Sequence, residues 1–154
     1  MMKIEIVDYK PEYAIHFERI NKAWLEEYFT IEPIDKYVLE NPQAAILDHG
    51  GHILFAQYEH QIVGAAALRF VEPVVFELTK MGVDQNLRGQ GTGKILCAAA
   101  IEKAKEIGAS KVILYSNRIL ANAINIYLKL GFTEIPLDAV YKRSDIKMEL
   151  VLKP

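Results

Sequence analysis

Three glycines at alternate positions mark the part of the chain best suited to chemistry. Gly89, Gly91 and Gly93 stand where an apolar, strand-like run gives way to an alanine-rich segment of helix formers. Glycine lets a backbone approach a ligand closely, and the first turn of a helix presents unpaired N–H groups at the positive end of its dipole. With Arg88 beside the turn, the pattern predicts a site for a pyrophosphate group.

Two commoner nucleotide-binding motifs do not fit these residues. A P-loop requires a glycine five positions before its Gly-Lys pair and a serine or threonine after it, but Arg88 and Ile95 occupy those positions. A dinucleotide fingerprint requires a third glycine where Lys94 stands, within an early βαβ unit, and this turn lies past the middle of the chain. A plain glycine-rich loop remains as the alternative to a phosphate site.

The segments on either side of the turn carry strand and helix patterns in a definite order. A strand over residues 3–7 precedes a helix that Pro11 opens, in which apolar residues recur every three or four positions. The later predicted elements are a short helix over 35–39, four strands over 44–47, 53–58, 62–70 and 74–83, a helix over 94–107, a strand over 111–115, a helix over 120–130 and a strand over 145–152. Short breaks between the four strands favour antiparallel hairpins. The order predicts an α/β or α+β fold with a mixed sheet.

Length and composition favour one globular domain, residues 1–154, and narrow the choice of partner. Half of the residues are apolar and a quarter charged, which is too hydrophobic for a disordered chain. The net charge of −2 gives no basic field for nucleic acid, and no apolar run approaches the ~20 residues of a membrane helix. Because no secretory signal is visible, a cytoplasmic location is expected by default. The four histidines lack metal-ligand spacing, and the single Cys97 excludes an intramolecular disulfide.

Two ordered motifs resemble one known family. The pattern Arg88-x-x-Gly91-x-Gly93, preceded by the run over 77–83, resembles the acyl-CoA signature of the GNAT superfamily of N-acetyltransferases. The run over 122–132, which ends in Gly131-Phe132, is similar to the later helix of that family. The resemblance is specific from about residue 76 to 132, and the amino-terminal third matches by layout alone. It implies a single domain with a central mixed, mostly antiparallel sheet flanked by helices.

The resemblance also implies a reaction and a place for its co-substrate. Acetyl-CoA would donate an acetyl group to a primary amine of a small molecule, peptide or protein by direct attack, without a metal. Its pantetheine arm would lie in a gap where the fourth and fifth strands splay apart. The residues expected to bind it are Met81, Gly82, Val83, Arg88, Gly89, Gln90, Gly91, Thr92, Gly93, Lys94, Asn117, Asn122 and Tyr127. A non-catalytic acyl-CoA sensor is the alternative function.

Glu77 and Tyr127 are the candidate catalytic residues. A protonated amine needs a base, and Glu77 lies four residues before Met81, so that strand alternation would place both on one face unless a bulge intervenes. A glutamate on a solvated strand face is the other interpretation. By resemblance, Tyr127 would hydrogen-bond the coenzyme A sulfur and protonate the leaving thiolate. Its spacing from Ile124 and Leu130 also fits an ordinary core stripe.

The acceptor side is the less informative part of the sequence. Glu27, Tyr28 and Phe29, and the late loop over 141–143, are expected to face the acceptor. Their mix of aromatic and acidic residues suits a cationic amine, although the acids also fit the solvated ends of helices. Whether edge strands pair in a homodimer is left open by the resemblance.

Overall fold

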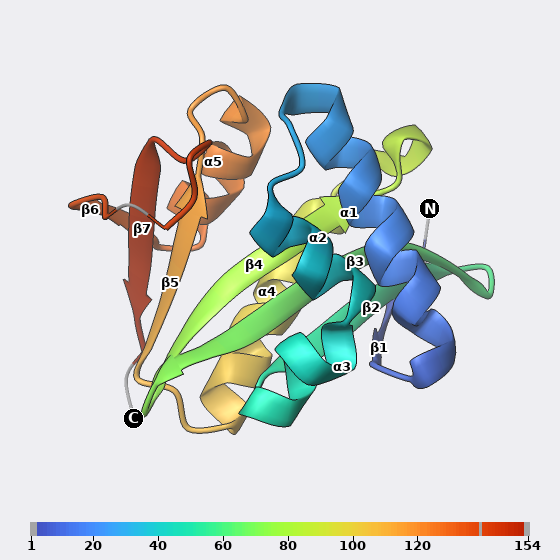
Figure 1. Ribbon diagram of the computed structural model, residues 1–154, viewed down its shortest axis with the longest axis horizontal. Coiled ribbons are helices and arrows are strands. Elements are labelled where there is room, and N and C mark those ends of the chain that lie inside the picture. Colours follow the sequence, from blue (N-terminus) through green and yellow to red (C-terminus); the bar gives the residue numbers. More distant parts are fainter. Residues whose placement is uncertain (1–2, 139, 153–154) are drawn as a thin grey trace.

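A seven-stranded sheet runs through the computed structural model in the order β1-β2-β3-β4-β5-β7-β6 (Figure 1). The structure describes residues 3–138 and 140–152. The strands are β1 Glu5–Asp8, β2 His52–Tyr58, β3 Gln61–Glu72, β4 Val75–Val83, β5 Lys111–Ser116, β6 Thr133–Ile135 and β7 Ile146–Val151. Only β4 and β5 pair in parallel; the other neighbours within the described residues are antiparallel. The predicted mixed, mostly antiparallel sheet is confirmed.

Helices cover both faces of this sheet. On one face lie α1 Ala14–Tyr28, α2 Pro33–Glu40 and the short α3 Pro42–Ala45, and on the other lie α4 Thr92–Glu106 and α5 Ala121–Lys129 (Figure 1). Strand alternation divides the core between them: Phe55 packs with Phe17 of α1 and Leu39 of α2, whereas Leu54 belongs to the cluster that contains Leu96 of α4. The 3₁₀ turns are η1 Pro11–Tyr13, η2 Leu47–His49 and η3 Gln85–Leu87.

Glycine caps fix the ends of the two helices on the second face. Gly108 and Gly131 adopt φ of 83° and 102° after α4 and α5, in the left-handed region where glycine avoids the Cβ penalty. In each case the next amide bonds back across the turn, and for α5 this bond joins Phe132 N–H to the carbonyl of Tyr127 at 3.0 Å. The second cap holds the end of the helix that carries Tyr127.

The structure differs from the sequence prediction in two elements: one predicted strand is absent from the described residues, and one short strand was not predicted. Residues 44–47 form the end of α3 and the start of η2 instead of a strand, because Pro42 at the first helical position favours a helical turn. The three-residue strand β6 was not predicted. It pairs with β7 through Thr133, Glu134 and Ile135, a segment too short to show any alternation.

The sheet parts between its fourth and fifth strands. β4 pairs with β5 only at Val75↔Lys111, Phe76↔Val112 and Glu77↔Ile113, after which β5 continues beside β7 alone. Figure 1 shows the two strands close at one end and diverging toward α5 and the end of α1. The edge of β4 beyond Glu77 therefore lacks a neighbouring strand on the side of β5 within the described residues.

A bulge lies in β4 beyond the point where the strands part. The register against β3 shifts between the pairs Ala67↔Thr79 and Ala65↔Gly82, so one extra residue is inserted in β4. Lys80 within it has φ of 51°. An extra residue changes which side chains share a face of the strand.

Gly82 has its own packing reason, because a Cβ there would lie 2.7 Å from Cδ1 of Trp24. The absence of a side chain lets α1 approach β4 next to the bulge.

No helix in the described parts of the chain has the length and hydropathy to cross a membrane.

Candidate active site

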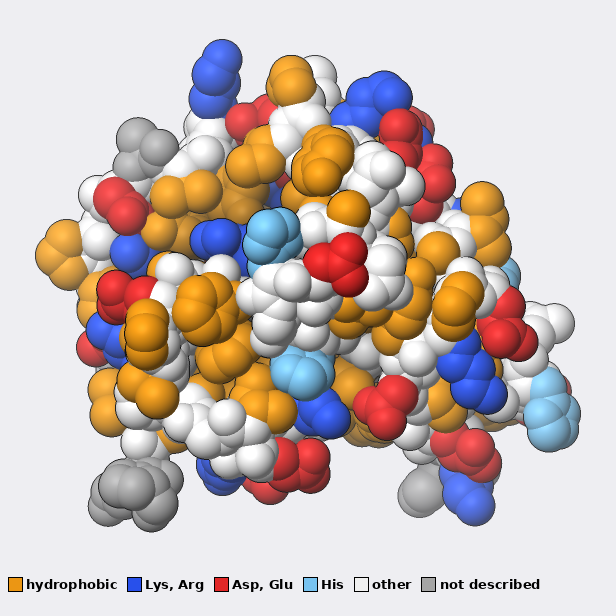
Figure 2. Space-filling model, turned by 60° about the horizontal axis from the view of Figure 1, so that its bottom comes forward, with side chains coloured by type: hydrophobic (Ala, Val, Ile, Leu, Met, Phe, Trp, Pro, Cys, Tyr) orange, Lys and Arg blue, Asp and Glu red, His pale blue; other side chains and the backbone are white. Residues whose placement is uncertain are grey.

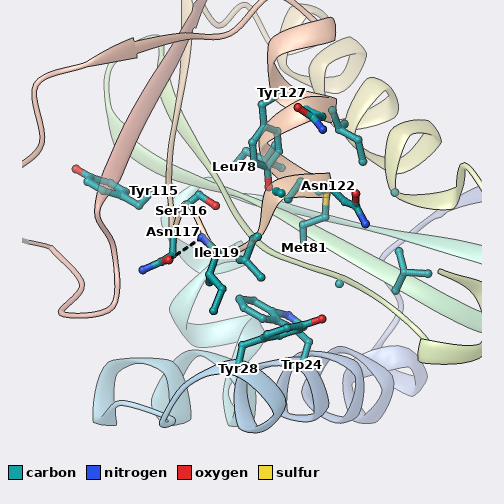
Figure 3. A pocket seen from close by; sticks show the side chains of 18 of the residues that line it. Trp24, Tyr28, Leu78, Met81, Tyr115, Ser116, Asn117, Ile119, Asn122 and Tyr127 are labelled. Atoms are coloured by element: carbon teal, nitrogen blue, oxygen red, sulfur yellow. Dashed lines mark hydrogen bonds between the residues drawn. The ribbon is translucent and has the colours of Figure 1, made fainter. Parts of the chain in front are cut away.

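A cleft of about 670 Å³ occupies the gap between β4 and β5. Its walls come from the second half of β4, the glycine turn, the loop after β5, α5 and the end of α1 (Figure 3). Thirteen of the predicted site residues line it: Tyr28, Phe29, Met81, Gly82, Val83, Arg88, Gly89, Gly91, Gly93, Lys94, Asn117, Asn122 and Tyr127. Glu27, Glu77, Gln90 and Thr92 do not, among the described residues. Residues about a hundred positions apart in sequence, such as Tyr28 and Tyr127, thus line the same cavity.

The glycine turn forms one end of the cleft. Gly89 and Gly91 have φ of 78° and 86°, and Gly91 is the N-terminal cap of α4, whose carbonyl accepts the first helical bond from Ile95. The amides of the first turn therefore point toward the cleft end without helical partners. Thr92 is buried, and its Oγ1 has no hydrogen-bond partner in the described part of the chain. This geometry suits an anionic group at the start of α4.

Arg88 connects the glycine turn to α1. Its Nε donates to the carbonyl of Val83 at 3.3 Å, and its Nη1 donates to Oε1 of Glu27 at 2.8 Å. The hydrogen bond from Arg88 holds the pKa of Glu27 below its usual range. Glu27 was predicted to face the acceptor, but its charge is matched by Arg88 at the mouth of the cleft.

Tyr127 points into the cleft from α5, toward the side on which Met81 lies (Figure 3). Its ring packs edge-on against Phe132, with centroids 5.8 Å apart. Burial, with a smaller contribution from Cys97, raises the pKa of the Tyr127 phenol. No hydrogen bond involves its hydroxyl within residues 3–138 and 140–152, so a proton donor faces the cavity without a protein partner. The ring of Tyr127 thus packs in the core, while its hydroxyl faces the cleft (Figure 3).

The two predicted asparagine contacts differ in their freedom. Asn117 uses both ends of its amide within the protein, since Nδ2 donates to the carbonyl of Arg143 at 2.7 Å and Oδ1 accepts from the Ile119 amide at 2.9 Å (Figure 3). It orders the loop after β5. Asn122, at the start of α5, is exposed and lines the cleft.

Glu77 lies below the point where the strands part and is only 1% exposed. Its Oε1 accepts from Nε of Arg69 at 2.8 Å and its Oε2 accepts from the Tyr141 hydroxyl at 2.9 Å. The prediction that Glu77 shares a face with Met81 is wrong. Met81 packs against the cluster that contains Leu78, because the extra residue of the bulge reverses the alternation between Glu77 and Met81.

Tyr141 is the residue that the sequence placed only loosely, as part of a late loop. It is buried yet lines the cleft, and its ring lies 4.9 Å from Nζ of Lys80 and 4.8 Å from Cζ of Arg143. Burial, and then the charge of Glu77, raise the pKa of the Tyr141 phenol. Two cations therefore flank the ring whose hydroxyl binds Glu77.

Asp35 holds both of those cations. This carboxylate, with 0% exposure, lies 2.8 Å from Nζ of Lys80 and 2.6 and 2.9 Å from the two terminal nitrogens of Arg143. Burial acts to raise its pKa, but the bonds from Arg143 and the charge of Lys80 prevail and hold the pKa below its usual range. Its partners lie 45 and 108 residues away in sequence, beyond any local signal.

Known proteins resemble the chain in both sequence and structure. The family model described as "Acetyltransferase (GNAT) family" matches residues 17–132. A mycothiol acetyltransferase of Saccharomonospora viridis is 32% identical over 117 residues, covering 71% of this chain and 38% of that protein. The chain thus spans well under half the length of that relative.

Two solved structures share the fold over nearly all of the chain. An acetyltransferase of the GNAT family from Staphylococcus aureus superposes with a TM-score of 0.87 at 26% identity, covering 98% of this chain and 100% of that one. A PaiA N-acetyltransferase from Thermoplasma acidophilum, in complex with coenzyme A, superposes with a TM-score of 0.75 at 20% identity, over 98% and 100% of the two chains. The glycine turn, the parted strands and the family match lead to one conclusion: the chain belongs to the GNAT family of acetyltransferases.

Proposed function

We propose that this protein transfers the acetyl group of acetyl-CoA to a primary amine by direct attack. The observation that carries the proposal is the continuous cleft from the glycine turn, along the unpaired edge of β4, to the hydroxyl of Tyr127. A pyrophosphate at the start of α4 would leave the pantetheine arm along that edge, as an added strand. The thioester would then lie between Met81 and Tyr127.

Binding would use backbone groups more than charged side chains. The free amides of α4 and the left-handed glycines suit the pyrophosphate, with Lys94 and Arg88 near the same end of the cleft. Arg88 already binds Glu27, so its charge is shared between that carboxylate and the ligand. On β4, the backbone of Met81 and Val83 would bind the pantetheine amides, and a backbone N–H near Met81 would meet the oxyanion as charge develops.

Tyr127 would donate a hydrogen bond to the leaving sulfur. When the amine nitrogen bonds to the thioester carbon and the carbon–sulfur bond breaks, the electron pair stays on sulfur as a thiolate. A phenol whose pKa is raised by burial stays protonated at neutral pH, and so remains a hydrogen-bond donor to that sulfur. Because the hydroxyl has no partner among the described residues, it is available for this contact.

Glu77 would accept the amine proton through Tyr141. Glu77 does not line the cleft, whereas Tyr141 does and donates its hydroxyl to the Glu77 carboxylate at 2.9 Å. The attacking nitrogen would pass a proton to the Tyr141 oxygen as Tyr141 passes its own to Oε2 of Glu77. The phenol is unchanged at the end of this exchange, and the carboxylate holds the proton. Glu77 thus remains the proposed base, acting one side chain away from the substrate.

Isothermal titration with acetyl-CoA tests the proposal first, with ATP and NAD as controls at equal concentration. We expect acetyl-CoA alone to bind. A screen of amines by thiol release then separates an enzyme from a non-catalytic sensor, which would bind acetyl-CoA without turnover on any amine. Preference for ATP or NAD would overturn the assignment of the cleft to coenzyme A.

A further inference from the structure

A second, smaller hollow adjoins the cofactor cleft. It has a volume of about 180 Å³ and lies among α2, β3, β4 and the loop before β7. Thr79, Lys80 and Tyr141 line both cavities, so they form a shared wall beside the proposed proton route. The two cavities therefore meet at these three side chains.

The rest of the hollow is mainly apolar. Its other lining residues are Ile34 and Val38 of α2, Ile46, Arg69 and Val140. Ile34 and Val140 are 47% and 40% exposed, and both border a cavity instead of being isolated on a convex surface. Acidic and basic side chains are interspersed over the face seen in Figure 2, and neither sign prevails there. That face therefore offers no strong field of one sign to attract a charged acceptor.

The carboxylates bound to this wall are already matched by cations. Asp35 binds Lys80 and Arg143, and Glu77 binds Arg69. Glu32, at the start of α2, also binds Arg143. Acids near α2 were part of the reason to expect a cationic amine as acceptor, but Glu32 and Asp35 are already paired with cations of the protein. The hollow therefore presents apolar side chains beside ion pairs whose charges already balance.

We infer that the hollow binds the apolar group of the acceptor, so that the preferred substrate is a primary amine carrying one aromatic or branched aliphatic group. This inference rests on the proposed acetyl transfer. An apolar cavity of about 150 Å³ holds a benzene molecule, so the hollow is large enough for a single ring. The amine end of the substrate passes Thr79 and Tyr141 to reach the thioester, while Ile34, Val38 and Ile46 contact the apolar end.

A matched panel of amines tests this substrate class at saturating acetyl-CoA. Phenethylamine and isoamylamine carry one apolar group each, whereas putrescine and spermidine carry a second cationic amine. Release of free thiol gives kcat/KM for each. We expect the apolar amines to exceed the polyamines by at least about tenfold, since a small difference in apolar contact within a pocket changes kcat/KM by about 10- to 200-fold.

Two variants localise the effect to the hollow. Ile34→Asp places a carboxylate at its mouth in the first turn of α2, where an acid is compatible with the helix dipole. We expect a fall of about tenfold or more in kcat/KM for phenethylamine and a smaller disadvantage for putrescine, with unchanged acetyl-CoA affinity. Ile15→Asp is the matched control: Ile15 is an exposed isoleucine in the first turn of α1 and does not line either cavity. Val38→Phe fills the hollow and should exclude phenethylamine more strongly than methylamine.

The outcomes separate this inference from the proposed function. If acetyl-CoA binds and polyamines are the better acceptors, or if Ile34→Asp acts no differently from Ile15→Asp, the hollow is not the acceptor pocket, and the acetyltransferase proposal stands. If acetyl-CoA does not bind, or no amine in the panel is acetylated, both are overturned. Preference for apolar amines that only the Ile34 and Val38 variants reduce supports both.

Discussion

The hydroxyl of Tyr141 donates a 2.9 Å hydrogen bond to Oε2 of Glu77, and this contact joins a carboxylate buried below the cleft to a side chain that lines it. The two residues come from elements 64 positions apart. Arg69 binds the other oxygen of the same carboxylate. Both partners therefore fix the orientation of the Glu77 carboxylate, and the proposed proton route reaches it through Tyr141.

A double-mutant cycle tests that route. Tyr141→Phe and Glu77→Gln should each lower kcat by about 10²-fold or more, the lower range of general-base contributions, with little change in the Kd for acetyl-CoA. Because both act in one step, the double variant should be no slower than the slower single variant. Losses that multiply would show two independent roles and contradict the relay.

Tyr127→Phe should lower kcat with little change in acetyl-CoA affinity. The phenylalanine keeps the packing against Phe132 but removes the hydroxyl that faces the cleft. Single-turnover kinetics with a good acceptor would measure the loss, and titration calorimetry would measure the affinity. Undiminished turnover would remove Tyr127 from the mechanism.

The raised pKa of Tyr127 also predicts how stability changes in alkali. In the unfolded chain the phenol ionises near its ordinary pKa of about 10, whereas in the folded protein burial keeps it protonated to higher pH. The stabilisation is complete below about pH 10 and is lost as pH rises toward the folded pKa. Urea unfolding between pH 8 and pH 11 should show this loss, and Tyr127→Phe should reduce its slope. An unchanged slope would mean that Tyr127 ionises as freely in the folded state.

Gly91→Asp should weaken acetyl-CoA binding by tenfold or more. Two unit charges 4 Å apart repel by about 1 kcal/mol in water and about 4 kcal/mol near a protein surface, and the new carboxylate would face the pyrophosphate. Gly108→Asp is the matched control, because Gly108 has a φ of 83° and Gly91 a φ of 86°. A Cβ atom added at either glycine would meet no other described atom within 4 Å. Backbone strain is thus similar in the two variants. Equal acetyl-CoA affinity in both would move the pyrophosphate elsewhere.

Asp35→Asn should destabilise the fold by about 3–5 kcal/mol, because it removes the buried carboxylate that binds Lys80 and, among the described residues, leaves Arg143 with Glu32 alone. Glu40→Gln provides the comparison, since Glu40 also binds two cations, Lys22 and Lys36, but at the surface. Surface pairs contribute little to stability, so Glu40→Gln should cost far less than Asp35→Asn. Chemical denaturation at neutral pH measures both variants, and similar values would show that burial of Asp35 adds nothing.

The lowered pKa of Asp35 sets the sign of its acid dependence. A carboxylate that ionises more readily when folded stabilises the protein above its unfolded pKa of about 3.9. That stabilisation is lost as pH falls through the lower folded pKa. Asp35→Asn should therefore flatten the stability curve below about pH 4, as measured by denaturation at successive pH values.

Most of the site residues predicted from local signals line the larger cleft. The glycine turn, the cap at Gly131 and the position of Tyr127 depend on residues close in sequence, whose backbone preferences are strong. Alternation failed at Glu77 because a single inserted residue, within the positive-φ bulge at Lys80, reverses the faces beyond it. No pattern of residue types in β4 marks that insertion.

The contacts of Glu27 and Asp35 could not be predicted because they are made between distant elements. Glu27 is an ordinary helix-end acid in the sequence, and its pairing with Arg88 depends on how α1 lies over the glycine turn. The same holds for Asp35, whose two partners come from β4 and from the loop before β7. Composition there indicated charge, but not that the charges cancel.

The parting of β4 from β5 has a mechanical consequence. Within the sheet, β5, β6 and β7 are joined to the other four strands through three residue pairs at one end, so strand hydrogen bonds hold the other end of this junction less firmly. A ligand that hydrogen-bonds to β4 and packs against α5 would replace the missing strand contacts and hold the two parts of the sheet together. Occupancy should then raise the melting temperature in proportion to the logarithm of ligand concentration, and hydrogen exchange in β5 should slow most toward Ser116.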